Sequence, residues 1–289
     1  MKNKFNKVTI VLVSYKSLIK IERFIKKIPS QIPIIIIENS KDNNIKKKLK
    51  NKKNIRVILN TNNGYGSSIN LACGKIKTQY FLVSNPDIEG VKLSSIKDFY
   101  KYAKILKDKF SVIGPHFKNA SKKGHYQTSL SYTLKEIHNV HGSVMFFNKR
   151  IFNKVGCFDA NFFMYWEETD YTKRALKKGF SAYQLNKVKV KHEKGNSVNL
   201  KTKEDKQKLK HLYTWHFIWS KYYFYKKHYG LILSLIYFFP IAVRILFRIL
   251  IHQNNRNKLL KYIYRWRGLK SSIMLKKSLL RLENIKINH

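Results

Sequence analysis

The first 90 residues contain four short apolar runs, and each run leads into polar residues. The runs cover residues 8–15, 34–37, 55–59 and 80–83. Runs of this length bounded by turn residues are typical of buried parallel strands. Helix-compatible segments at residues 17–27 and 67–76 separate some of them, so the order predicts a doubly wound, mainly parallel α/β sheet with right-handed crossovers. The polar residues at the strand ends are Ser14, Glu38, Asn63 and Asp87.

These polar ends are expected to line one edge of the sheet, where open α/β sheets bind their ligands. Asp87 closes the sequence Asn85-Pro86-Asp87. Pro86 fixes its own φ angle and biases Asn85 toward extended geometry, which aims both polar side chains. We interpret Asp87 as a contact for an anionic substrate or for the metal that carries it; an Asx turn that ends the strand is the alternative.

A glycine pair follows the third apolar run. Gly64 and Gly66 permit a tight turn and a close approach of backbone to ligand at a helix N-terminus. The spacing is neither GxGxxG nor a Walker loop, so the pair by itself is a weak indication of phosphate or base contact.

The middle of the chain is predicted to add a helix at residues 93–107 and strands at residues 111–115, 144–147 and 182–190. Residues 117–137 are polar and irregular, which suggests a mobile loop on the acceptor side. His138 and His141 have no acid beside them, so ordinary polar residues at a sheet edge are favoured over metal ligands. His192 ends the last strand and shares a face with two apolar valines.

A second acidic cluster follows a run of aromatic residues. Glu167, Glu168 and Asp170 are three of only 16 acids in the chain, and a helix is expected from there to Lys178, before Gly179. Asp170 can pair with Arg174 at i,i+4, which is a structural role. The aromatic run beside Glu168 suggests a partly desolvated carboxylate with a raised proton affinity, which suits a general base.

The charge balance points to a polyanionic neighbour. Lysine and arginine total 59 residues and give a formal net charge of +43, although lysine is abundant throughout the chain. Nucleic acid and an anionic membrane surface both fit this balance. Cys73 and Cys157 are far apart and form no CxxC motif, so a disulfide framework or a zinc site is not supported and a reducing cytosol fits. The apolar run near the N-terminus is too short for a signal-peptide core.

The character of the chain changes after residue 200, so we predict one domain at residues 1–200 and a basic, aromatic, helical tail at residues 201–289. Residues 229–251 would form an apolar helix about 35 Å long. Arg244 and Arg248 interrupt it, each at a cost of about 2.5–3.5 kcal/mol at a bilayer centre. We therefore favour a helix in the membrane interface over a spanning helix, with a helix packed on the first domain as the remaining alternative.

Taken together, these motifs resemble glycosyltransferase family 2, whose members have the GT-A fold with a Rossmann-like nucleotide-binding half, and most closely its rhamnosyltransferase-like branch. The match covers about residues 8–198, in family order. Its motifs are Ser14-Tyr15, Glu38-Asn39-Ser40, Asn63-Gly64 with Gly66 and Asn70, Asn85-Pro86-Asp87, Gly156-x-Phe158-Asp159, residues 162–170 with Arg174 and Gly179, and His192 with Gly195 and Ser197.

The resemblance implies a role for each matched position. Glu38 would contact the nucleotide base, and Tyr15 and Asn63 would shape its pocket. Asp87 and His192 would hold Mg²⁺ or Mn²⁺ at the donor diphosphate. Glu168 would be the general base, although many members carry Asp there, so Glu167 or Asp170 could share the role. Asn85 replaces the first Asp of the commoner motif. The remaining donor-site positions are Ser14, Asn39, Gly64, Gly66 and Asn70.

The activity implied is an inverting transfer of rhamnose or a similar hexose from a dTDP- or UDP-linked sugar. The acceptor would be a glycan or a polyprenyl-diphosphate-linked glycan of a bacterial surface polysaccharide such as O-antigen or capsule. The protein would be cytoplasmic and attached peripherally to the anionic cytoplasmic face of the inner membrane. The alternative is a nucleic-acid-binding protein without catalytic activity, which is disfavoured because no helix-turn-helix, zinc-finger or RNP-like pattern is present.

Overall fold

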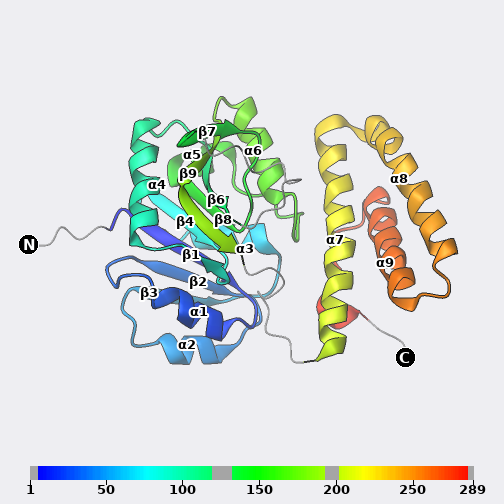
Figure 1. The fold of residues 1–289 in the computed structure, drawn as a ribbon, viewed down its shortest axis with the longest axis horizontal. Helices are drawn as coiled ribbons and strands as arrows, with labels where there is room; N and C mark the ends of the chain where they lie inside the picture. The colour runs from blue at the N-terminus through cyan, green and yellow to red at the C-terminus, as the bar shows by residue number, and fades with distance from the viewer. Residues whose placement is uncertain (1–5, 119–131, 193–201, 286–289) are drawn as a thin grey trace, which may run out of the picture. The chain divides into compact units, whose positions relative to one another are not determined.

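The apolar runs form the strands of one mixed sheet in the computed structural model, which describes residues 6–118, 132–192 and 202–285 (Figure 1). In these residues the sheet has nine strands in the order β3-β2-β1-β4-β8-β6-β9-β5, with β7 also paired to β9. The strands are β1 (Val8–Ser14), β2 (Ile34–Glu38), β3 (Ile55–Leu59), β4 (Tyr80–Ser84), β5 (Ile88–Glu89), β6 (Val112–Phe117), β7 (Leu134–Ile137), β8 (Val144–Asn148) and β9 (Ala182–His192).

The predicted doubly wound α/β sheet is confirmed, but it is mixed rather than mainly parallel, because β8, β5 and β7 pair antiparallel to their neighbours. Strands β3, β2, β1 and β4 are mutually parallel, and β6 is parallel to β9. Strand β8 is inserted antiparallel between β4 and β6. The start of β8 therefore lies beside the end of β4, with Val144 opposite Ser84.

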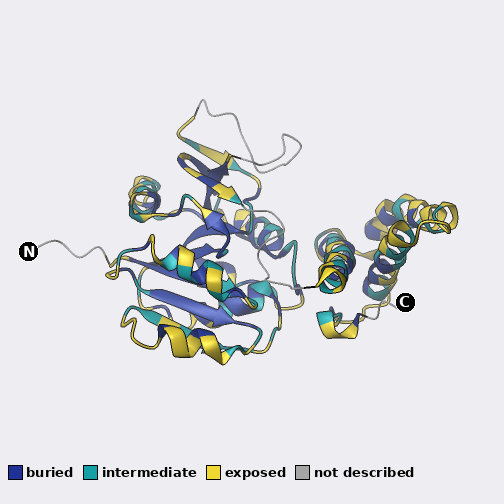
Figure 2. Ribbon diagram, turned by 60° about the horizontal axis from the view of Figure 1, so that its bottom comes forward, coloured by how far each residue is buried: buried dark blue, intermediate teal, exposed yellow. Residues whose placement is uncertain are grey.

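Helices cover both faces of the sheet because strand residues alternate between two apolar clusters. Ile10 and Leu82 pack with α1, α2 and α4 on one face, and Val11 and Val83 pack with α3, α5 and α6 on the other. Figure 2 shows the strands as the buried layer. The helices are α1 (Leu18–Ile25), α2 (Asn43–Leu49), α3 (Tyr65–Cys73), α4 (Leu93–Ile105), α5 (Lys149–Val155) and α6 (Glu167–Lys177).

Three local expectations are corrected. Helix α2 lies between two strands that were expected to follow each other directly. Its polar sequence lacks the apolar pattern that would predict a helix. Asp42 caps the helix, because its carboxylate accepts a hydrogen bond from the Asn44 amide. Helix α3 starts at Tyr65 rather than near residue 67. Part of the segment 117–137, expected to be irregular, is the strand β7, and residues 119–131 lie outside the described residues.

The chain divides into two compact units. The sheet unit, as we call it, contains residues 1–159 and 168–199, and the helical unit contains residues 160–167 and 200–289. The division predicted at residue 200 matches the start of the second segment of the helical unit, whereas the aromatic segment 160–167 groups with the helices although it precedes that point in the chain. The helical unit has α7 (Lys203–Tyr229), α8 (Leu231–Ile251), α9 (Arg256–Ile273) and the 3₁₀ helix η1 (Leu282–Asn284).

Helices α7 and α9 of the helical unit run parallel and very close together. His211 stacks on Tyr264, and Ser272 donates to the Trp219 carbonyl, so the contacts advance in the same direction along both helices. A Cβ atom at Gly268 would lie 2.5 Å from the Trp215 carbonyl oxygen, which no side chain could tolerate. Glycine is therefore required at this crossing.

The segment 160–167 packs on α7 within the helical unit. Ser220 donates a hydrogen bond of 2.8 Å to the Met164 carbonyl, and the Trp166 ring lies 5.0 Å from that of Phe224. Tyr165 and Trp166 both adopt positive φ angles, of 66° and 72°. Bulky residues rarely occupy this left-handed region, so the aromatic contacts stabilise a strained turn.

Candidate active site

Asp87 and His192 meet at the edge where the strands end. Asp87 directly precedes β5, and the Ile88 of that strand pairs with His192 at the end of β9. The Oδ2 atom of Asp87 lies 3.2 Å from Nε2 of His192, and the Asp87 side chain is fully buried. The pairing of a two-residue strand thus joins two motifs that are far apart in the chain.

The loop before β8 brings His141 to this site. Because β8 is antiparallel to β4, this loop lies beside the segment that follows β4, and the Asn85 amide donates to the Ser143 carbonyl at 2.9 Å. The His141 ring lies edge-on to that of His192, with ring centroids 5.7 Å apart. His141 was expected to be an ordinary residue at a sheet edge; the strand pairing that brings it to the site has no signature in its own sequence.

Glu168 lies against this loop at Gly142. A Cβ atom at Gly142 would be 3.6 Å from the Glu168 carboxylate, so the loop passes directly over it. Glu168 is only 9% exposed, and its burial raises its pKa to about 7, although hydrogen bonds from Thr169 and Asn139 oppose the shift. A carboxylate with this pKa can accept a proton near neutral pH.

The neighbouring acids of the cluster have different surroundings. Asp170 is fully buried and accepts a hydrogen bond of 2.8 Å from Arg174 Nε. The same guanidinium donates to the carbonyls of Val155, Gly156 and Cys157, which fixes the turn after α5. Glu167 is buried and belongs to the aromatic segment of the helical unit. The geometry therefore favours Glu168 among the three candidates for the base.

We expect Arg174→Ala to destabilise the sheet unit by about 3–5 kcal/mol, because Asp170 would be left as a buried charge without its partner. Thermal unfolding followed by circular dichroism measures the effect. Lys177→Ala removes an exposed cation from the same helix and is the matched control. If Arg174→Ala had the same melting temperature as the control, the ion pair between Arg174 and Asp170 would not stabilise this unit.

The residues predicted to face the nucleotide base organise the first strand ends. Glu38 is fully buried, and its carboxylate accepts hydrogen bonds from Ser14 Oγ, from both the amide and the hydroxyl of Ser40, and from the Lys16 amide. Tyr15 lies in the turn that these bonds hold, and it is half-buried. Glu38 thus shapes the loop around Tyr15 in addition to any contact with a base.

The other donor-site positions lie after β2, at Asn39, and at the start of α3, at Asn63, Gly64 and Gly66. Asn39 forms a network with Asn60 and Ser68, two residues that sequence analysis did not single out. Gly64 has a φ of 108°, which explains glycine at the start of α3. Asn63 precedes it and is exposed, and Gly66 is buried in the first turn of the helix.

Asn70 has a structural contact. Its side chain exchanges two hydrogen bonds with the backbone of Phe158, at 2.8 and 3.0 Å, so that it links α3 to the Gly156-x-Phe158-Asp159 motif. Two other motif positions, Gly195 and Ser197, lie outside the described residues.

Asp87 and His192 are suitable ligands for a divalent cation. Among the described residues, no group of three or more His, Cys, Asp or Glu side chains is placed to hold a metal by itself. Magnesium-type sites are usually completed by substrate phosphates and waters around one or two carboxylates. One buried carboxylate beside one imidazole fits that pattern, and it does not fit a closed structural zinc site.

Comparisons with known proteins identify the family and the fold of the chain. The sequence profile of Glycosyl transferase family 2 matches residues 9–168. The chain is also 22% identical over 206 residues to the low-salt glycan biosynthesis hexosyltransferase Agl10 of Haloferax volcanii. That alignment covers 64% of this chain and 66% of the relative, just under two thirds of its length.

Solved structures of three glycosyltransferases share the fold. The mannosyltransferase PcManGT from Pyrobaculum calidifontis, in complex with GDP-Man and Mn²⁺, aligns with a TM-score of 0.57 at 10% identity and covers 94% of this chain and 88% of its own. GalNAc-T7 with UDP, GalNAc and Mn²⁺ gives 0.54 at 15% identity, over 78% and 50%. Residues 1–349 of S. aureus TarS with UDP give 0.51 at 13% identity, over 93% and 92%.

Proposed function

Because this chain belongs to glycosyl transferase family 2, we propose that it transfers a hexosyl group from a nucleoside-diphosphate sugar to an acceptor hydroxyl with inversion at the anomeric carbon. It is an enzyme, so the alternative of a nucleic-acid-binding protein without catalysis is not retained. The observation that carries the proposal is a buried carboxylate with a pKa of about 7, Glu168, which lies next to the loop that reaches the Asp87–His192 pair.

The proposed reaction is a single displacement. Glu168 takes the proton of the acceptor hydroxyl as its oxygen forms a bond to the anomeric carbon. The bond between that carbon and the diphosphate oxygen breaks, and its electron pair leaves with the nucleoside diphosphate. Attack opposite to the leaving group inverts the anomeric configuration. The loop at residues 138–143 contacts the base at Gly142 and the metal pair at His141, and proton transfer and leaving-group stabilisation are assigned to different residues.

Asp87 and His192 would hold the divalent cation, Mg²⁺ or Mn²⁺. When it is bound, the cation neutralises charge on the diphosphate leaving group. Two of the structural neighbours contain Mn²⁺, which supports a divalent cation here. The edge-to-face contact with His141 would orient the His192 ring. His141 is in turn held by the backbone N–H of Ser143, which donates a hydrogen bond of 3.2 Å to its Nδ1 atom.

We propose UDP or dTDP as the donor nucleotide, rhamnose or a similar hexose as the sugar, and a surface glycan or a polyprenyl-diphosphate-linked glycan as the acceptor. The relative that is a hexosyltransferase of glycan biosynthesis supports a hexose and a glycan. UDP is present in two of the neighbours and GDP-Man in the third, so GDP sugars belong in the test.

The test of the proposed function uses radiolabelled UDP-, dTDP- and GDP-hexoses with Mn²⁺ and a lipid extract as the source of acceptor. We expect label from one nucleotide class to enter the organic phase, with release of the matching nucleoside diphosphate. Omitting Mn²⁺ and adding EDTA should abolish the incorporation. Incorporation from none of the donors, combined with no calorimetric binding of any nucleotide by the folded protein, would contradict the proposal.

The pKa of Glu168 predicts the pH dependence of the reaction. The base works only when deprotonated, so kcat/KM should fall about tenfold per pH unit below pH 7 and level off above it. Rates measured from pH 5 to pH 9 test this. In Glu168→Asp, kcat/KM should still fall at acid pH, with the midpoint at a different pH. A wild-type kcat/KM that does not change with pH below pH 7 would exclude Glu168 as the base.

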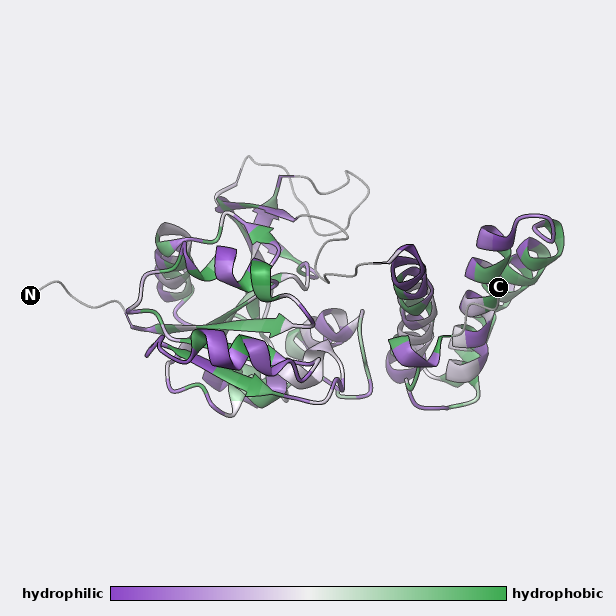
Figure 3. Ribbon diagram, turned by 90° about the horizontal axis from the view of Figure 1, so that it is seen from below, coloured by the Kyte–Doolittle hydropathy of each residue, from purple (hydrophilic) through white to green (hydrophobic). Residues whose placement is uncertain are grey.

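We further propose that α8 attaches the protein to the anionic face of a membrane. Among the described residues, α8 is the one helix long and apolar enough to cross a membrane by length and composition, and only 17% of its apolar window is buried, so it is not a buried core helix. In Figure 3, hydrophobic stretches are visible among the helices of the helical unit as well as in the strands of the sheet. The buried positions of α8 are Ser234, Phe238 and Ile245.

The arginines of α8 support an orientation in the interface. Since a helix has 3.6 residues per turn, Arg244 and Arg248 lie between the buried stripe and the opposite, wholly apolar side. From there they can reach lipid phosphates while the apolar side enters the acyl boundary. The exposed residues of that side are Ile232, Ile236, Phe239, Val243, Phe247 and Leu250.

Charged substitutions on this side should release the protein from membranes. We expect a variant with Ile236, Phe239 and Phe247 replaced by Glu to move from the membrane pellet to the supernatant in cell fractionation. The matched control replaces Ile19, Ile105 and Leu176, three exposed apolar residues of the sheet unit, by Glu. A variant that remains in the pellet as fully as the control would exclude α8 as the anchor.

A further inference from the structure

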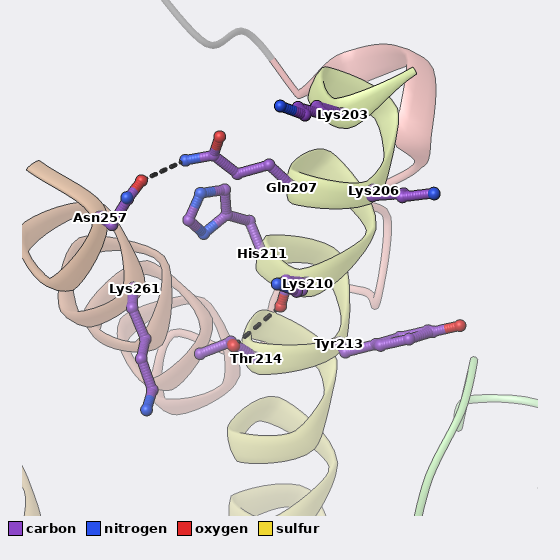
Figure 4. Close-up of a pocket in the computed structure, with 9 residues that line it drawn as sticks. All are labelled: Lys203, Lys206, Gln207, Lys210, His211, Tyr213, Thr214, Asn257 and Lys261. Atoms are coloured by element: carbon purple, nitrogen blue, oxygen red, sulfur yellow. Dashed lines mark hydrogen bonds between the residues drawn. The ribbon is translucent and has the colours of Figure 1, made fainter. Parts of the chain in front are cut away.

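A basic pocket lies between α7 and α9, within the helical unit (Figure 4). Its volume is about 680 Å³, which is in the range of ligand sites. None of the nine residues that line it is acidic. They are Lys203, Lys206, Gln207, Lys210, His211, Tyr213, Thr214, Asn257 and Lys261.

The lysines of the pocket are not held in ion pairs within the described part of the chain. By contrast, the neighbouring Lys208 pairs with Glu204 at 2.6 Å. Cations that converge on one cavity repel each other, and a bound anion removes that repulsion. Both helices also begin here, α7 at Lys203 and α9 at Arg256. The acids Glu204 and Asp205 in the first turn of α7 offset its positive end, whereas the first turn of α9 has no acid and adds to the potential.

His211 provides an independent indication of a ligand. It is only 4% exposed, and its Nε2 atom has no hydrogen-bond partner among the described residues. Its ring stacks on Tyr264 with centroids 4.8 Å apart, which fixes its direction. In Figure 4 the ring points from α7 toward α9, into the space between the helices, whereas Lys206 points to the opposite side. A buried ring nitrogen without a partner is unfavourable unless a ligand or water satisfies it.

The polar residues beside His211 are already placed for a ligand. The Gln207 amide donates to the Asn257 side-chain oxygen at 2.7 Å and bridges the two helices. Burial and the charge of Lys210 lower the pKa of His211, so the ring is neutral at pH 7 and can donate from one nitrogen. Positive charge thus comes from the lysines, and directional donors come from His211 and the amides.

We propose that this pocket binds a phosphate monoester or diphosphate, with Lys203, Lys210 and Lys261 around the anion and His211 donating to it. Lysine ammonium groups suit phosphate as point charges, and the volume leaves room for the group that carries it. The phosphate is either free or the headgroup of a lipid, and α8 of the same unit exposes the apolar surface that the second source would meet.

Pyrophosphate tests the site directly. The full-length protein is titrated with inorganic pyrophosphate by calorimetry, in EDTA so that the metal-dependent nucleotide site does not contribute. We expect saturable binding of one equivalent. Affinity should fall about tenfold or more in the variant with Lys203, Lys210 and Lys261 replaced by Gln. His211→Phe keeps the stacking on Tyr264 and should also weaken binding. The absence of saturable binding by the wild type would overturn the proposal.

A matched control distinguishes binding in the pocket from attraction by the positive charge of the whole unit. Replacing Lys226, Lys270 and Lys277 by Gln removes the same charge from the helical unit outside the pocket. This control should bind pyrophosphate within about twofold of the wild type, because screened surface charges contribute little. An equal loss in the control would overturn the proposal. All variants should keep Mn²⁺-dependent nucleotide binding, so a failure of the proposed transferase function remains a separate result.

A second measurement identifies the source of the phosphate. Phosphatidylcholine vesicles with about one tenth phosphatidic acid are compared with vesicles that carry the same fraction of phosphatidylglycerol, a phosphodiester. Preference for phosphatidic acid that pyrophosphate competes away, and that the pocket variant loses, assigns the site to a lipid headgroup. Pyrophosphate binding without any such preference assigns it to a free phosphate compound.

Discussion

Glu168→Gln is expected to lower the rate of sugar transfer by about 10²–10⁴-fold, which is the usual contribution of a general base. The amide keeps the size of the side chain and its contact with the loop at Gly142, but it cannot accept the proton of the acceptor hydroxyl. Binding of the nucleotide should remain within about twofold of the wild type, because the effect is confined to the transition state. Initial rates and calorimetric binding of the donor nucleotide measure the two quantities.

The neighbouring acids provide the controls for this substitution. Glu136→Gln changes an exposed carboxylate of β7 in the same unit and should leave the rate unchanged. Glu167→Gln should have a small effect on the chemical step. A large loss in Glu167→Gln together with an active Glu168→Gln would transfer the role of base to Glu167 and contradict the assignment made from burial and pKa.

Asp87→Asn is expected to reduce the transfer rate by about 100-fold or more and to abolish the enhancement of nucleotide binding by Mn²⁺. The substitution removes the buried carboxylate that lies beside His192, and a metal contributes several kcal/mol to the stabilisation of charge on a transferring group. Nucleotide binding without metal should change little. Calorimetry of UDP and dTDP with and without Mn²⁺ separates these effects.

Asp98→Asn is the matched control for Asp87→Asn. Asp98 is a carboxylate of the same unit that pairs with Lys187 on the surface, at 3.0 Å. Its loss should affect neither the metal dependence nor the rate, because exposed ion pairs contribute little. If Mn²⁺ still enhanced nucleotide binding in Asp87→Asn, the cation would be bound by other residues, and the assignment of Asp87 and His192 as its ligands would be wrong.

The sheet and its polar edge could be predicted because local sequence determines them. Short apolar runs followed by Ser14, Glu38 or Asp87 carry the pattern of a parallel sheet whose carboxyl ends form a site. The raised proton affinity of Glu168 could also be predicted, since the aromatic residues that precede it indicate burial. Both properties depend on residues that are neighbours in the chain.

The remaining parts of the site depend on pairing between distant segments. His141 reaches His192 only because β8 runs antiparallel to β4, and strand order cannot be read from either segment alone. The contact of Asn70 with Phe158 likewise joins residues 88 positions apart. The packing of residues 160–167 in the helical unit was missed for the same reason, since Met164 and its partner Ser220 on α7 are 56 positions apart.

The most direct test of the account is a crystal structure of the protein with UDP or dTDP and Mn²⁺, with anomalous scattering used to locate the cation. We predict a manganese peak at coordination distance from the Asp87 carboxylate and the His192 ring, with the nucleotide diphosphate as a further ligand. A manganese peak bound to the nucleotide but away from both residues would contradict the metal site and the reaction built on it.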